Sequence, residues 1–259
     1  MNKPEISIIL PSIRPENLNN VYDSILLSTK RTFELIVAGP FPLPQRLQDI
    51  SNVKYVKDIG SPVRASNIAS TLAEGKIFKW FSDDSIFYPG ALDKTIDLLY
   101  NMGDDYKNVV VMKYLEGKNG TNKTLQNDDY FKMNGSDWTR SPYIPNSYWL
   151  FNECVMYREF FEELGGWDNR FLGTFYSHAD MANRAQFLGS NVIMADFPIS
   201  DCDHEQNDHK PIEIAQVEFD KPLYYSIYNK PDWVMNEMRL DIHSWKDSPI
   251  VWDLRFKVQ

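Results

Sequence analysis

The sequence predicts an α/β fold in which helices cover both faces of a mainly parallel sheet. Short apolar runs, of the length that buried parallel strands have, alternate with segments of helical spacing from residue 5 onward. Polar residues directly follow several of these runs, and ligands bind beyond the carboxyl ends of the strands in open sheets of this kind. The positions of these residues therefore predict a ligand site at that edge of the sheet.

The first strand and the first helix have clear patterns. Residues 5–11 form a short apolar run that ends at Pro11. Within residues 15–30, apolar side chains such as Val21 and Ile25 fall on one helical face. By the same criteria we predict strands at residues 33–38, 53–56, 77–81 and 109–112, and helices at residues 65–74 and 89–100.

The second half of the chain has weaker patterns. Polar residues 116–146 are expected to form a long loop over the site, since loops of this length are often functional. After residue 205 the pattern fades, so we predict a main domain of residues 1–205 and a C-terminal extension of residues 206–259 packed on it. Helices are expected at residues 159–164 and 180–188, and a strand at residues 192–195.

The composition excludes several classes of protein. Hydrophobic residues make up 43% of the 259, which is ordinary for a globular chain, and the net charge of −9 does not favour nucleic-acid binding. Cys154 and Cys202 are too few for a disulfide framework, and no apolar run is long enough to span a membrane. We expect a cytoplasmic protein. Peripheral contact with a membrane and homo-oligomerisation are both compatible with the sequence.

Two adjacent carboxylates, Asp83 and Asp84, directly follow the predicted strand at residues 77–81. Adjacent carboxylates repel each other, and a divalent cation such as Mn²⁺ or Mg²⁺ relieves that repulsion. A cation held there can bridge the two phosphates of a nucleoside diphosphate and stabilise it as a leaving group. The alternative is a helix start with aspartate as its N-cap.

The segment Ile77–Leu92, with Ser82-Asp83-Asp84-Ser85 and then Pro-Gly-Ala-Leu, resembles the metal-binding segment of family 2 glycosyltransferases of the GT-A fold. That resemblance implies a Rossmann-like, mainly parallel mixed sheet and an inverting transfer from a nucleotide-sugar donor, with UDP or GDP as the nucleotide. It also implies that Asp84 binds the metal and that Asp83 faces the donor's ribose or the metal shell.

Upstream segments extend the resemblance. The run from Ser7 to Ser12 resembles the family's opening strand, whose end meets the nucleotide, so Pro11 and Ser12 are implied as donor contacts. The segment from Arg64 to Asn67 resembles the family's Ala-Arg-Asn helix start, in which the arginine helps to hold the donor. The arginine lies two residues early here, and the resemblance implies Arg64 and Asn67 as donor contacts. A helix cap is the alternative for Asn67.

The chain departs from the family after the second predicted strand. Where the family often has an aspartate that contacts the base, this chain has Ala38-Gly39-Pro40. Asp58, which follows the third predicted strand, is then the candidate for the base contact.

Downstream, residues 152–171 resemble the family's acceptor-side segment of a helix followed by Gly-Gly-Phe-Asp and Arg-Phe. The resemblance implies that Trp167 and Asp168 lie on the acceptor side, and the flat apolar face of Trp167 suits a sugar ring. A place in the hydrophobic core is the alternative for Trp167.

Residues 177–184 align with the family's Glu-Asp-x-Asp-Leu segment, in which an aspartate is the general base. By strict register His178 takes that position, and Asp180 matches the downstream aspartate. Histidine can act as a base near neutral pH, so either residue is a candidate. A surface histidine followed by a helix-capping aspartate is the alternative.

A late histidine, His204, matches the residue that many GT-A enzymes add to the metal. The implied partners are a nucleotide-sugar donor and an acceptor hydroxyl on a glycan, a lipid-linked molecule or another compound, as in glycan or polysaccharide synthesis. A degenerate protein that binds sugar or nucleotide without turnover is the alternative function. A nucleotidyltransferase ranks last, because residues 11–15 contain no glycine.

Overall fold

The computed structural model describes residues 3–118, 121–126, 151–203, 210–229 and 240–256. Its strands are β1 Ile6–Pro11, β2 Phe33–Gly39, β3 Val53–Lys57, β4 Ile77–Trp80, β5 Ser85–Phe87, β6 Asn108–Lys118, β7 Thr121–Gln126, β8 Cys154–Tyr157 and β9 Asn191–Asp203. Its helices are α1 Leu18–Ser28, α2 Gln45–Gln48, α3 Pro62–Ser70, α4 Ala91–Asn101, α6 Arg158–Glu163, α7 Thr174–Phe187, α8 Lys210–Ile214 and α9 Lys221–Tyr228. Short helical turns are η1 Pro15–Asn17, η2 Ala215–Asp220 and η4 Ser244–Asp247.

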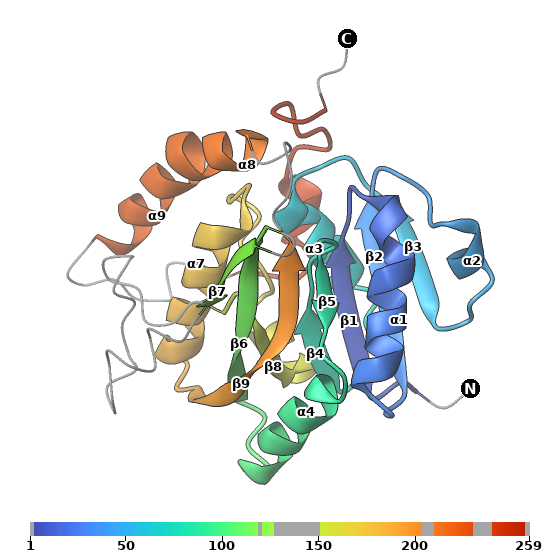
Figure 1. The fold of residues 1–259 in the computed structure, drawn as a ribbon. Coiled ribbons are helices and arrows are strands. Elements are labelled where there is room, and N and C mark those ends of the chain that lie inside the picture. Colours follow the sequence, from blue (N-terminus) through green and yellow to red (C-terminus); the bar gives the residue numbers. More distant parts are fainter. Residues whose placement is uncertain (1–2, 119–120, 127–150, 204–209, 230–239, 257–259) are drawn as a thin grey trace.

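The described strands form one mixed sheet in the order β3-β2-β1-β4-β8-β6-β9-β5, with β7 added to β6 (Figure 1). Strands β1 to β4 are parallel, and β1 lies between β2 and β4. Every residue of β2 is buried, which explains why this strand is a continuous apolar run in the sequence. The predicted α/β fold with a mainly parallel sheet is confirmed.

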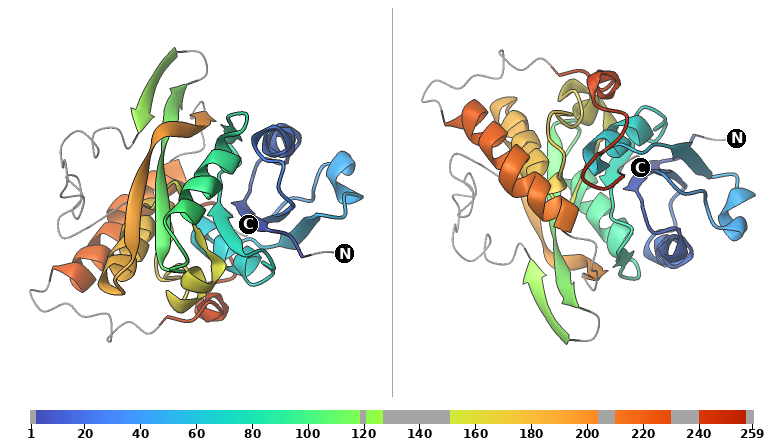
Figure 2. Two further views of the ribbon diagram at one scale, coloured as in Figure 1. Left: turned by 90° about the horizontal axis from the view of Figure 1, so that it is seen from below. Right: turned by 90° about the horizontal axis from the view of Figure 1, so that it is seen from above.

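Helices cover both faces of the sheet, as Figures 1 and 2 show. Alternate residues of β1 point to opposite faces, so Ile8 packs with α1 and α4 while Ile9 packs with α3, α6 and α7. Because β1 to β4 are parallel, the polar residues that follow them lie at one edge of the sheet, which the helices on its faces leave open. No helix in the described part of the chain is long and apolar enough to cross a membrane.

Three strands were absent from the sequence prediction. β8 lies in the middle of the sheet, antiparallel to β4 and β6, but it has only four residues and no alternation. β5 is shorter still and pairs with the end of β9. The predicted loop at residues 116–146 is wrong at its start, where β6 continues to Lys118 and β7 forms a hairpin with it. Residues 119–120 and 127–146 lie outside the described part.

Two helices begin earlier than predicted. α3 begins at Pro62, after Ser61, whose side chain accepts a hydrogen bond from the backbone nitrogen of Arg64. α7 begins at Thr174. Asn67 and Asp180 therefore lie inside helices, and the alternative that each is a helix cap is wrong.

The C-terminal part packs against the sheet domain. α8, η2 and α9 follow one another without a break, and Tyr224 and Tyr228 of α9 join the core beneath α7. Farther along, Val251 pairs with Ile59 just after β3. The segment from residue 240 to 256 thereby crosses the carboxyl ends of the parallel strands (Figure 2).

Gly39 allows the end of β2 to approach the chain that leaves β1. A Cβ atom at Gly39 would lie 1.8 Å from the backbone oxygen of Ser12. We expect Gly39→Ala to reduce the free energy of unfolding by about 3 kcal/mol, because a backbone oxygen cannot move aside as a flexible side chain can. Urea denaturation measures this loss.

The control is Gly189→Ala. Gly189 has a φ of 76° but open space around it, so only backbone strain of about 1 kcal/mol is expected there. Equal losses for the two variants would contradict the steric explanation.

Candidate functional site

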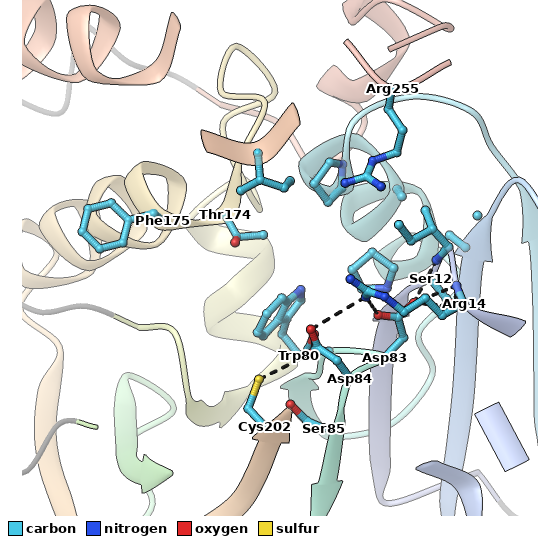
Figure 3. A pocket seen from close by; sticks show the side chains of 18 of the residues that line it. Ser12, Arg14, Trp80, Asp83, Asp84, Ser85, Thr174, Phe175, Cys202 and Arg255 are labelled. Atoms are coloured by element: carbon cyan, nitrogen blue, oxygen red, sulfur yellow. Dashed lines mark hydrogen bonds and ion pairs between the residues drawn. The ribbon is translucent and has the colours of Figure 1, made fainter. Parts of the chain in front are cut away.

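A cavity of about 650 Å³ opens at the carboxyl ends of the parallel strands (Figure 3). Its volume is in the range of small-molecule and cofactor sites. The structure brings together around it the following predicted residues: Pro11, Ser12, Asp58, Asp83, Asp84 and His178. It places the following predicted residues outside the cavity wall: Arg64, Asn67, Trp167, Asp168 and Asp180. His204 lies outside the described residues.

Asp83 attaches the chain after β1 to the end of β4. Its Oδ2 accepts hydrogen bonds from Ser12 Oγ at 3.0 Å, from the backbone nitrogen of Ile13 at 2.9 Å and from that of Arg14 at 3.0 Å. Its Oδ1 forms an ion pair with the Arg14 guanidinium. Both carboxylate oxygens thus have donors within the chain, so Asp83 shapes the cavity wall.

Asp84 has fewer partners than Asp83. Its Oδ1 accepts hydrogen bonds from Ser82 and, at 3.5 Å, from the Cys202 thiol, whose pKa is raised by burial and by the charge of Asp84. Its Oδ2 forms a longer ion pair with Arg14, 3.7 Å from Nη1, which is beyond hydrogen-bond distance. A carboxylate oxygen that lines a cavity and has no hydrogen-bond donor among the described residues suits a hard divalent cation.

The strand β9 ends beside Asp84. The backbone nitrogen of Asp203 donates to the backbone oxygen of Asp84 at 2.8 Å, and Asp203 Oδ1 is buried without a hydrogen-bond partner among the described residues. Those residues contain no group of three or more histidine, cysteine, aspartate or glutamate side chains that could hold a metal. Among the described residues, Asp84 could contribute one ligand to a metal, but no complete set of ligands surrounds it.

His178 lines the cavity between two indole rings. Its ring meets Trp80 and Trp167 edge to face, with centroids 4.9 and 4.8 Å away. Neither ring nitrogen has a hydrogen-bond partner of normal geometry in the described part, although the backbone of Phe151 is close enough to favour protonation. Burial, assisted by the charge of Lys79, lowers the pKa of His178 to about 3. The alternative of a surface histidine is wrong.

Asp180 is fully buried behind the cavity wall. Its Oδ2 forms an ion pair with Arg184, 2.8 Å from Nη2, and its Oδ1 accepts a hydrogen bond from the Tyr228 hydroxyl at 2.6 Å. The same guanidinium donates to the backbone oxygens of Leu164 and Gly166. Asp180 thereby holds the glycine turn after α6 against α7.

The predicted acceptor-side residues also lie behind the wall. Asn67 binds the backbone of Trp167 twice, donating to its oxygen at 2.7 Å and accepting from its nitrogen at 2.9 Å. Trp167 is 2% exposed, so it has the core position given above as the alternative. Asp168 is buried and paired with Arg170.

Arg64 binds the C-terminal segment. It pairs with Asp58 at 3.1 Å and donates to the backbone oxygens of Trp245 and, at 3.3 Å, Ser248. Its guanidinium also lies over the Trp245 ring, 5.1 Å from the centroid. Asp58 itself faces the cavity and accepts a hydrogen bond from the backbone nitrogen of Gly60 at 3.0 Å.

Several lining residues were not identified from the sequence. Arg14 had a usable signal, since it is a cation in the loop directly after the first strand. The C-terminal residues had none, because their place in the wall depends on how a segment far along the chain packs. The residues missed include Arg14, Trp80, Thr174, Phe175, Glu213, Gln216, Trp252 and Arg255.

Comparison with known proteins supports the resemblance given by the motifs. No protein-family model matches the chain. The uncharacterized glycosyltransferase RP339 of Rickettsia prowazekii (strain Madrid E) is 29% identical over 114 residues, a match that covers 42% of this chain and 35% of that protein. The chain thus matches about a third of that relative's length.

The fold is also that of S. aureus TarS. The crystal structure of TarS 1-349 has a TM-score of 0.55 at 14% identity, covering 88% of this chain and 76% of that one. The complex of TarS 1-349 with UDP-GlcNAc has the same TM-score at 15% identity, covering 79% of this chain and 60% of that one. These similarities confirm the GT-A fold that the motifs implied.

Asp180→Asn tests the role of the buried ion pair. The variant leaves Arg184 buried with a weaker partner, so we expect a loss of roughly 3–5 kcal/mol in the free energy of unfolding. The control is Asp23→Asn, which breaks an exposed pair with Arg46 and is expected to cost less than about 1 kcal/mol. Urea denaturation of both variants compares them, and equal losses would contradict a structural role for Asp180.

His178 makes stability depend on pH. Its folded-state pKa of about 3 lies below the ordinary value of 6.5, so between these values the unfolded chain binds a proton that the folded chain does not. Stability is therefore lost as pH falls from 6.5 toward 3, by up to about 1.4 kcal/mol per pH unit from this residue. His178→Phe is expected to have a correspondingly shallower dependence in denaturation at pH 6.5, 5.5 and 4.5. Parallel curves would exclude this contribution.

Proposed function

We propose that the protein is an inverting glycosyltransferase that moves a sugar from a nucleoside-diphosphate-sugar to an acceptor hydroxyl with the assistance of a divalent metal. The observation that carries this proposal is the position of Asp83 and Asp84 in a cavity at the carboxyl end of β4. The fold shared with TarS, which was crystallised with UDP-GlcNAc and with UDP, favours a uridine nucleotide as the donor.

The donor's nucleoside is proposed to bind at the ends of β1 and β3. Pro11, Ser12 and Asp58 form this part of the wall. Asp58 already accepts from Arg64 and Gly60, but a carboxylate has about four acceptor positions, so it can also accept from a base N–H. Asp58 then takes the place of the base-contacting aspartate that this chain lacks after β2.

The diphosphate is proposed to lie against Asp84. A Mn²⁺ or Mg²⁺ ion held by Asp84 would supply a Lewis acid that stabilises the charge of the leaving diphosphate. Arg14 pairs closely with Asp83 and only at 3.7 Å with Asp84, so Asp84 is the proposed metal ligand of the two adjacent carboxylates. The additional ligand predicted at His204 stays a prediction.

The transfer is proposed to be a single displacement. The acceptor oxygen forms a bond to the anomeric carbon as the bond from that carbon to the diphosphate oxygen breaks, and the diphosphate keeps the electron pair. A base takes the hydroxyl proton. Of the two predicted bases, His178 lines the cavity and Asp180 does not, so His178 is the proposed proton acceptor.

The acceptor is proposed to enter beside the start of α7. Thr174 and Phe175 line the cavity there, and Phe175 is 38% exposed, so its ring offers an apolar face to a sugar. These two residues replace Trp167 and Asp168, which lie behind the wall, as the proposed acceptor contacts.

One observation favours a second function, a protein that binds the nucleotide or sugar without turnover. A histidine with a pKa of about 3 is a poor proton acceptor, and the nearest carboxylate on α7, Asp180, is occupied by Arg184. Such a protein would retain the cavity and the affinity for nucleotide but would not release the sugar.

Binding of UDP with and without Mn²⁺ tests the donor site. We expect wild-type protein to bind UDP in a metal-dependent manner and Asp84→Asn to bind it roughly 10- to 100-fold more weakly, because the metal loses a charged ligand. Isothermal calorimetry measures both affinities. Asp49→Asn, which removes an exposed carboxylate outside the cavity, is the control and should bind like wild type.

Absence of UDP and GDP binding by the wild-type protein would overturn the donor-site assignment. If the wild type binds UDP, an assay with UDP-GlcNAc separates the two functions. NMR follows the release of sugar and determines the anomeric configuration of the product. Inverted product supports the transferase, and metal-dependent binding without any release supports the binding protein.

A further inference from the structure

The C-terminal segment, residues 240–256, is attached to the domain at several separate points. Beyond the bonds from Arg64, the Ser248 hydroxyl donates to the backbone oxygen of Asn169 at 3.1 Å, and the Asn169 amide donates to Ser244 at 2.9 Å. The backbone nitrogen of Trp252 donates to the oxygen of Ile59 at 2.9 Å. Ile59 is adjacent to Asp58, so the segment is fixed directly beside the proposed nucleoside site.

The end of this segment turns into the cavity. The backbone nitrogens of Arg255 and Phe256 both donate to the oxygen of Trp252, at 2.9 and 2.8 Å, which forms a tight turn. All three of these side chains line the cavity. The Arg255 guanidinium lies over the Trp252 ring, 5.6 Å from its centroid, and Figure 3 shows the side chain extending into the cavity.

The Trp252 ring fixes the direction of Arg255. Trp252 is 4% exposed and its backbone is bonded on both sides, so its ring cannot turn freely. A guanidinium over an indole face is held by a cation–π contact, which restricts a long and otherwise mobile side chain.

The charge of the cavity wall makes this arginine important. Arg14 and Arg255 are the arginine and lysine residues that line the cavity in the described part of the chain. The lining carboxylates are Asp58, Asp83, Asp84, Glu116, Glu153 and Glu213, of which Asp58, Asp83 and Glu153 form ion pairs with Arg64, Arg14 and Lys79. Such a wall repels a diphosphate unless cations face it, and the metal proposed at Asp84 is on the strand side of the cavity.

We infer that Arg255 binds the diphosphate of the nucleotide donor from the side opposite Asp84, so that the C-terminal segment completes the donor site. The planar guanidinium can donate two parallel hydrogen bonds to phosphate oxygens. The inference rests on the proposed function, and it assigns to the C-terminal segment a role that no resemblance implied.

The position of Arg64 supports this inference. By resemblance Arg64 was expected to hold the donor, but it lies outside the cavity wall and binds the backbone of the C-terminal segment. Arg64 thus fixes the segment that brings a second guanidinium, that of Arg255, into the cavity.

Arg255→Ala, compared on UDP and on uridine in the presence of Mn²⁺, tests the inference. We expect the variant to bind UDP roughly 10- to 100-fold more weakly than wild type, because a charged hydrogen-bond partner of the phosphates is lost. Uridine, which has no phosphate, should bind equally to both proteins. Arg255→Lys should have an intermediate affinity for UDP, because lysine keeps the charge without the planar pair of donors.

The matched control is Lys246→Ala, which removes an exposed cation from the same segment outside the cavity and should bind UDP like wild type. Calorimetry measures UDP affinity, and ligand-observed NMR measures uridine. Wild-type affinity of Arg255→Ala for UDP would overturn the inference while leaving the proposed function intact. An equal loss for UDP and uridine would also overturn it, since the effect would then be structural. Failure of the wild type to bind UDP would overturn both proposals.

Discussion

The carboxylate of Asp83 is the interaction on which the form of the cavity depends. Strands β1 and β4 lie side by side and parallel, so the chains leaving them emerge at the same edge. Asp83 ends one of these chains and holds the other through Ser12, Ile13 and Arg14. These donors and the ion pair with Arg14 balance the negative charge of Asp83, which reduces its repulsion with the adjacent Asp84. Asp84 is left toward the cavity.

A second polar network stabilises the wall from behind. Asp180 and Arg184 lie fully buried, and the guanidinium also satisfies the backbone of the turn at Gly166. Asn67 satisfies the backbone of Trp167 in the same turn. Buried charges are tolerated only where every partner is present, so this network fixes one arrangement of α3, α7 and the turn between them. The rings of Trp167 and His178 are held against each other as a result.

The C-terminal segment joins the network at its other edge. Arg64 connects Asp58 to the backbone of residues 245 and 248, and Ile59 pairs with Val251. The end of β3 and the end of the chain are thus one structural unit. One wall of the cavity is formed by the sheet and contains Asp84. Another wall is formed by the C-terminal segment and contains Arg255.

The amino-acid pattern was enough to predict the parallel half of the sheet and the place of Asp84 after β4. Strands that are buried on both faces are apolar along their whole length, so the apolar runs were sufficient to locate them. Polar residues at the carboxyl ends of parallel strands share one edge of the sheet, so the order of the runs was sufficient to place those residues together. The short central strand β8 was not predictable, because four apolar residues have no period, and its position between β4 and β6 is set by packing.

Which polar residues face the cavity depends on long-range packing. His178 and Asp180 lie two positions apart on one helix, where side chains point in different directions, and the packing of α7 against its neighbours decides which of them lines the wall. Contacts between distant segments likewise decide that Arg255 lines the cavity and that Arg64 lies outside its wall. Local sequence specifies a guanidinium or a carboxylate, but its partner, and hence its role, is set by the fold that surrounds it.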